Sequence, residues 1–216
     1  MKLRSLQIWP ATGILASLVA LALLAGEHFL DHGKALLPFE HHWLSEYVLS
    51  ASPIGQAMMR LAFVALGAAA ASVAALSNGR TQTGLFAICA TGLAAMALFD
   101  TDPNLPVHPE QWPTFHGLVH QGCLYVAMSA GLVAMALPSV RPGRNIVDLS
   151  LLGMAGLATA IQTVLVAESQ GKMTLYGGIT ERIIVAATLL WVIRYCRACS
   201  VKDTIRQCPS SVVSGS

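Results

Sequence analysis

Six long apolar runs constrain the fold of this chain more than any other feature of its sequence. Each is bounded by polar residues or by proline and glycine, and each approaches the 20 or so helical residues that cross the hydrocarbon core of a membrane, although the third is short. The runs cover Ile8–Gly26, Ile54–Leu76, Gly84–Phe99, Phe115–Leu137, Val147–Ala167 and Ile179–Tyr195. They predict an all-α fold, a polytopic transmembrane helical bundle with six spans.

The composition supports a membrane protein and excludes several other classes. Hydrophobic residues make up 55% of the 216 positions and charged residues only 11%, whereas soluble domains carry about a quarter of charged residues. A soluble monomer and a disordered chain are therefore excluded. The net charge of +2 is too small for a nucleic-acid partner. The expected partner is the lipid bilayer.

The distribution of basic residues predicts the orientation of the bundle. Nine of the 13 Lys and Arg residues lie in the N-terminus, in the loops after the second and fourth runs, and in the C-terminal tail. The alternate loops hold only Lys34 and Lys172. Because loops rich in Lys and Arg stay on the cytoplasmic side, both termini are expected to be cytoplasmic.

The chain is expected to form one domain. Residues 1–197 hold the six runs without an internal repeat, and residues 198–216 are interpreted as a short, disordered cytoplasmic tail. Small residues recur at the spacing by which membrane helices pack closely. Three such sets are predicted to mediate packing: Gly67 with Ala71; Ala127, Gly131 and Ala134; and Gly153, Gly156 and Ala160.

Two histidines open the fourth run. His116 and His120 are one helical turn apart, so both rings share a face with the small residues that follow. We expect this face to point into the bundle, and Thr114 to cap the helix. His120 would then lie about 9 Å deep, six residues at 1.5 Å each.

Other ionisable residues gather at the same end of the bundle. Arg60 falls inside the second run, where a guanidinium is costly and is expected to face the interior and pair with Asp100 or Glu181. Glu181 and Arg182 open the sixth run. Ser45 and Tyr47 precede the second run and add a hydroxyl and a phenol at the same height.

These residues form one candidate polar site with three open interpretations. The site comprises Ser45, Tyr47, Arg60, Asp100, Asp102, His116, His120, Glu181 and Arg182. The first interpretation is non-enzymatic binding of a small polar ligand or a lipid headgroup. The second is a zinc-dependent hydrolase that acts on a lipid at the outer leaflet, with His116, His120 and Asp102 as ligands. The third is a purely structural interhelical polar lock.

Four short motifs carry a resemblance to a known family. They are Ser45-Glu46-Tyr47, Phe99-Asp100-Thr101-Asp102-Pro103, His116-Gly117-Leu118-Val119-His120 and Gly178-Ile179-Thr180-Glu181-Arg182. In that order, over residues 8–197, they resemble the bacterial membrane family called domain of unknown function 998 (DUF998). The resemblance implies a bundle of about six spans in the bacterial cytoplasmic (inner) membrane, and it groups Asp102 with the four residues that open the fourth and sixth runs. It implies no activity.

Overall fold

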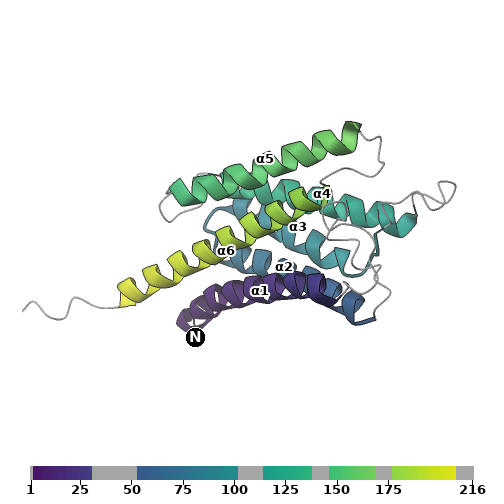
Figure 1. Ribbon diagram of the computed structural model, residues 1–216. Coiled ribbons are helices and arrows are strands. Elements are labelled where there is room, and N and C mark those ends of the chain that lie inside the picture. Colours follow the sequence, from purple (N-terminus) through teal and green to yellow (C-terminus); the bar gives the residue numbers. More distant parts are fainter. Residues whose placement is uncertain (1, 31–52, 102–113, 138–145, 169–176, 208–216) are drawn as a thin grey trace, which may run out of the picture.

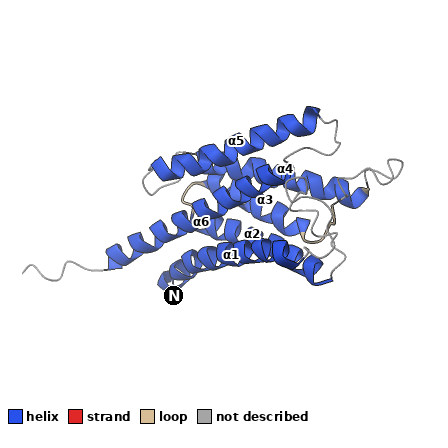
Figure 2. Ribbon diagram, viewed as in Figure 1, coloured by secondary structure: helices blue, strands red, loops and turns tan. Residues whose placement is uncertain are grey.

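The computed structural model describes residues 2–30, 53–101, 114–137, 146–168 and 177–207. Within these ranges all regular structure is α-helical, and the helices lie side by side in one bundle (Figures 1 and 2). The helices are α1 (Lys2–Leu30), α2 (Pro53–Leu76), α3 (Arg80–Met96), α4 (Phe115–Ala136), α5 (Ile146–Glu168) and α6 (Gly177–Gln207). The all-α class expected from the apolar runs is confirmed.

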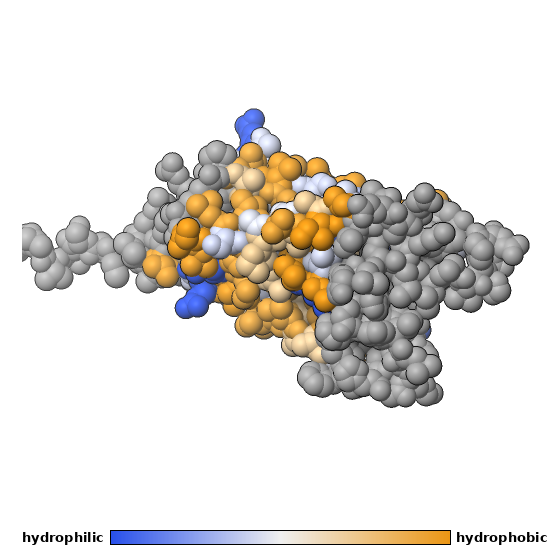
Figure 3. Space-filling view, turned by 45° about the horizontal axis from the view of Figure 1, so that its top comes forward, coloured by the Kyte–Doolittle hydropathy of each residue, from blue (hydrophilic) through white to orange (hydrophobic). Residues whose placement is uncertain are grey.

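Five of the described helices are long and apolar enough to cross a membrane. The five segments are Ile8–Gly26, Pro53–Leu76, Phe115–Ala136, Ile146–Val164 and Gly178–Val201. Large hydrophobic side chains remain exposed along these segments, and the described surface in Figure 3 is mostly hydrophobic. Exposed apolar area of this extent suits a surface in contact with lipid. The chain is therefore a multi-pass membrane protein.

The third helix does not reach the same length. α3 has 17 residues, about 26 Å at 1.5 Å per residue, against a hydrocarbon core of about 30 Å. It also lies earlier in the chain than the expected run Gly84–Phe99, because it starts at Arg80 and ends at Met96. The structure therefore supports five long spans, and the sixth expected span is a shorter helix packed among them.

A tight connection joins α2 to α3. Only residues 77–79 separate the two helices, so they run antiparallel as direct neighbours. The Ser77 hydroxyl donates a hydrogen bond to the Val73 carbonyl at 2.7 Å, and the amide of Thr83 donates to the Gly79 carbonyl at 2.9 Å. These bonds satisfy backbone groups at both helix ends.

The helices follow one another around the bundle. α1 packs on α2, α2 on α3 and α3 on α4, while α6 packs on α1, α2 and α5. α5 contacts α4 only slightly and lies at the edge of the bundle, on the side away from α1 (Figure 1). An ion pair also holds α5 to α6, because Arg194 Nε lies 2.7 Å from Asp148 Oδ1.

Glycines allow the closest helix contacts. A Cβ atom on Gly92 of α3 would lie 3.0 Å from the Cys123 carbonyl oxygen and 3.0 Å from the Ala127 Cβ, both on α4. A Cβ atom on Gly67 of α2 would lie 3.0 Å from the carbonyl oxygen of Ala90 on α3. The backbones of α2, α3 and α4 can approach this closely because these positions have no side chain.

The packing predicted from small residues is confirmed on α4 and not on α5. Ala127, Gly131 and Ala134 are all buried in the bundle. On α5, Gly153 is exposed, and a Cβ atom on Gly153 or Gly156 would meet nothing within 4 Å outside its own helix. The expectation that these two glycines pack against another helix of the chain is wrong, because α5 turns a different face toward α6.

The last helix is longer than its apolar run. α6 continues to Gln207, through residues 198–207 that the sequence assigned to a disordered tail. This expectation is wrong for these residues, because the intrahelical hydrogen bonding extends past the end of the hydrophobic segment. Residues 208–216 lie outside the described part of the chain.

Candidate functional site

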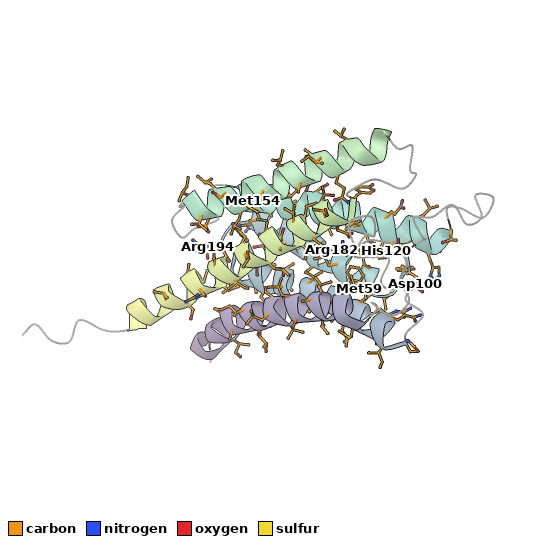
Figure 4. The ribbon with its side chains drawn as sticks, viewed as in Figure 1. Met59, Asp100, His120, Met154, Arg182 and Arg194 are labelled. Carbon is orange, nitrogen blue, oxygen red and sulfur yellow. The ribbon has the colours of Figure 1, made fainter. Side chains whose placement is uncertain are left out.

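The described candidate residues lie at one end of the bundle, where α2, α4 and α6 begin. We call it the site end, and the opposite end the far end. Figure 4 shows His120, Arg182, Asp100 and Met59 in this half of the bundle, whereas Arg194 lies toward the far end. Residues from separate parts of the sequence therefore lie in the same half of the bundle.

His120 is the most deeply placed candidate on α4. Thr114 caps this helix as expected, since its hydroxyl accepts a hydrogen bond from the Gly117 amide at 3.0 Å. His120 is 1% exposed, and its Nδ1 lies 2.7 Å from the carbonyl oxygen of Phe99. A carbonyl only accepts, so Nδ1 carries the hydrogen and donates it. The edge-on ring of Phe63 also contacts the imidazole, with centroids 5.6 Å apart.

His116 does not point into the bundle. It is exposed, and its ring packs against Phe99 and Phe115, with centroids 5.6 Å and 6.2 Å away. The expectation that both imidazoles face the interior is confirmed for His120 and wrong for His116. The ring of His116 instead lies against Phe99, in the residues that follow α3.

Arg60 pairs with one of its two expected partners. Its Nη2 lies 2.8 Å from Asp100 Oδ1, in the residues that follow α3. The two side chains are 44% and 41% exposed, so the expectation that Arg60 faces the interior is wrong. A long guanidinium side chain can reach along the helix surface to a carboxylate near the helix end, and this removes the need for burial.

The first turns of α6 place neighbouring residues in different surroundings. Glu181 is 4% exposed and Thr180 is also buried. Arg182 is half-buried, and its Nη1 donates a hydrogen bond to the Gly178 carbonyl one turn earlier, at 2.8 Å. The carboxyl group is thus the ionisable group that α6 carries into the interior at the site end.

Glu181 lines an apolar cavity of about 80 Å³. The cavity lies between α2, α3, α4 and α6, and Leu24 of α1 also touches it. Met59 and Met96 line it near the site end. Among the described lining residues, only Glu181 and Thr188 carry oxygen in their side chains. His120 lies one helical turn toward the site end from Leu124, another lining residue.

Three candidate residues lie outside the described part of the chain. They are Ser45, Tyr47 and Asp102. Within the described residues, no three His, Cys, Asp or Glu side chains gather closely enough to hold a metal ion. Of the two described residues in the expected zinc set, His116 is exposed, and His120 could offer only Nε2 because Nδ1 donates to Phe99. The zinc set stays a prediction.

Sequence reasoning missed the cavity and the carbonyl that holds His120. Most lining residues are Leu, Met, Ile, Val or Phe, and in an apolar run such residues carry no signal that separates cavity walls from lipid-facing positions. The Phe99 carbonyl is a backbone group. The nearest signal in the sequence for this carbonyl is the break after α3. A chain that leaves a helix has backbone carbonyl groups that still need hydrogen-bond donors.

Comparison with known families adds one finding. The family described as "Protein of unknown function (DUF998)" matches residues 14–198. The chain belongs to the DUF998 family. The match spans all the described site residues of this DUF998 protein, from Arg60 on α2 to Arg182 on α6. Neither the curated proteins nor the solved structures contain a match to it.

Proposed function

We propose that this DUF998 protein is a non-enzymatic binding protein of the bacterial cytoplasmic membrane, which takes a small polar molecule or lipid headgroup at the site end. In this proposal the site end faces outward, both termini are cytoplasmic and all six helices cross. The excess of Lys and Arg in the two termini and in the loops after α2 and α4 supports the orientation.

The geometry of the α2–α3 pair supports a crossing by α3. The helix leaves the far end after a three-residue turn, and Asp100 just beyond it reaches Arg60, seven residues into α2. Seven residues of helix are about 10 Å. The chain after α3 therefore returns to within about 10 Å of the level at which α2 begins, and residues 97–100 supply the length that α3 lacks.

The observation that carries the proposed binding is the position of Glu181. A carboxyl group inside a membrane bundle costs several kcal/mol if charged, so such groups commonly mark binding sites or pathways. Glu181 is buried in the wall of an apolar cavity, and His120 is buried a turn from the same cavity. An interhelical lock would need only the buried polar side chains, whereas an adjoining cavity offers space for a ligand.

The test is thermal stabilisation of the purified full-length protein by chain-free headgroups. Glycerophosphoethanolamine and glycerophosphoglycerol, present at about 100 times the dissociation constant, stabilise a protein that binds them by about 2.7 kcal/mol. For a chain of this size that corresponds to a rise in Tm of roughly 5–10 °C.

Two variants locate the binding. Glu181→Gln should abolish the rise in Tm, whereas Asp148→Asn, which breaks the ion pair with Arg194 toward the far end, should keep it. A protein that neither headgroup stabilises, or a rise that Glu181→Gln leaves intact, would overturn the proposal.

A further inference from the structure

The cavity beside Glu181 has the dimensions of a slot. Its lining on α6 extends from Glu181 to Thr188, and on α4 from Leu124 to Leu132, which is about 10–12 Å of helix. Its volume is about 80 Å³. An apolar cavity of about 150 Å³ admits benzene. Half that volume, drawn out over two helical turns, suits a single hydrocarbon chain better than a ring.

The slot is accessible from the side of the bundle. Five of its described lining residues are half-buried, and the other described ones are buried. Four of these five lie on α4 and α6: Met128, Leu132, Val185 and Thr188. None of the lining residues that the structure describes comes from α5, which packs closely on α6 but only slightly on α4. The accessible wall is therefore the one between α4 and α6, at the depth of the apolar spans.

The lining is suited to a flexible apolar ligand. Met59, Met96 and Met128 come from three different helices, and methionine side chains adapt to irregular shapes because they are unbranched and have three rotatable bonds. Cys89 and Gly131 line the slot deeper in the bundle, where small side chains leave room for a chain.

The polar end of the slot restricts the ligand further. Glu181 lies four residues from the start of α6, at the site end of the slot, and Thr188 lies two turns deeper. In either protonation state a carboxyl group accepts hydrogen bonds. It donates one only when protonated, so a ligand head that donates hydrogen bonds suits Glu181 in both states. An amine or a hydroxyl group meets this requirement, and an ionised carboxylate does not.

We propose that the slot binds the hydrocarbon chain of a single-chain amphiphile with an amine or hydroxyl head, and that the chain enters from the bilayer between α4 and α6. This inference rests on the proposed function, because the head of this molecule is the polar group bound at the site end. It adds the class of ligand and its route.

The experiment uses the full-length protein in phosphatidylcholine nanodiscs. The probes are hexadecylamine, hexadecanol and hexadecanoic acid, each with a photoreactive diazirine at mid-chain, and labelled peptides are mapped by mass spectrometry. The amine and the alcohol should label peptides around Met128 and Val185 more strongly than the acid does.

A pair of matched variants separates the slot from bulk lipid. Val185→Phe fills the slot, and Ile183→Phe adds a similar ring at an exposed position of the same helix. Val185→Phe should lower labelling on the order of tenfold, the factor expected when about two methylene groups lose their burial. Ile183→Phe should leave labelling unchanged. Equal labelling of the two variants, or strongest labelling by hexadecanoic acid, would overturn the proposal.

The two proposals fail in different ways. If chain-free headgroups stabilise the protein and Val185→Phe does not change labelling, the binding site stands and the hydrocarbon slot does not. If Val185→Phe blocks labelling but no headgroup stabilises the protein, the slot binds a chain and the proposed function is wrong.

Discussion

Replacing Gln82 should make this protein more stable. Gln82 is the third residue of α3, at the far end of the bundle, and its side chain is 0% exposed. Neither its Oε1 nor its Nε2 has a hydrogen-bond partner within the described chain. Each buried polar group left unsatisfied costs about 1–3 kcal/mol.

The substitution Gln82→Met removes both polar atoms at little other cost. Methionine is also unbranched, has a similar length and has nearly the same helix propensity. If each of the two atoms costs about 1 kcal/mol, the lower limit, the free energy of unfolding should rise by about 2 kcal/mol when both are removed. For a chain of this size, Tm should rise by roughly 4–8 °C.

Gln162 on α5 provides a second substitution whose effect on stability can be compared with that of Gln82→Met. It is also buried, but only its Oε1 is both fully enclosed and without a hydrogen-bond partner among the described residues. Gln162→Met should therefore raise stability by about half as much, near 1 kcal/mol. Both variants would be compared with the unmodified protein by thermal unfolding in the same detergent.

A fall in Tm for Gln82→Met would refute this reasoning. It would show that the amide of Gln82 makes hydrogen bonds in the membrane protein that exceed the cost of burying it. The far end would then hold a polar partner for the amide.

Three further outcomes follow from the structure. Gly92→Val should destabilise the bundle by about 1–3 kcal/mol, because its Cβ would lie 3.0 Å from the Cys123 carbonyl, whereas Gly153→Ala should be neutral or stabilising; thermal unfolding compares them. A cysteine at Asn78, which is exposed in the α2–α3 turn, should react with a membrane-impermeant maleimide only after the cytoplasmic face is opened, and labelling of intact cells would contradict the proposed orientation. Metal analysis should find zinc well below one ion per chain, and stoichiometric zinc that His120→Ala removes would favour the hydrolase instead.

The helices were predictable because apolar runs report directly on burial in lipid. The second and fourth runs match α2 and α4 to within a residue at each end. α6 was not predictable beyond Tyr195, since its last turns lack an apolar pattern and depend on continued backbone hydrogen bonding. Hydropathy finds the part of a helix in the membrane and not the part that projects from it.

The end of the bundle at which the described candidate residues lie was predictable, and their geometry was less so. Spacing placed His116 and His120 on one face, but it does not show that only His120 is covered by neighbouring residues. The pairing of Arg60 with Asp100 followed from the cost of an unpaired charge. The exposure of Arg60 did not follow from this cost, because exposure depends on how far the flexible side chain reaches. Relative helix positions, which a sequence leaves open, determine each of these features.

The short turn between α2 and α3 bears on how the chain enters a membrane. α3 is short and begins with Arg80, so it is a weak insertion signal by itself. α2 is among the most apolar helices and is joined to α3 by only three residues. The two are therefore best regarded as one unit of biogenesis, a helical hairpin in which α2 recruits α3. Lengthening the turn would uncouple them, and α3 would then have to partition on its own hydrophobicity.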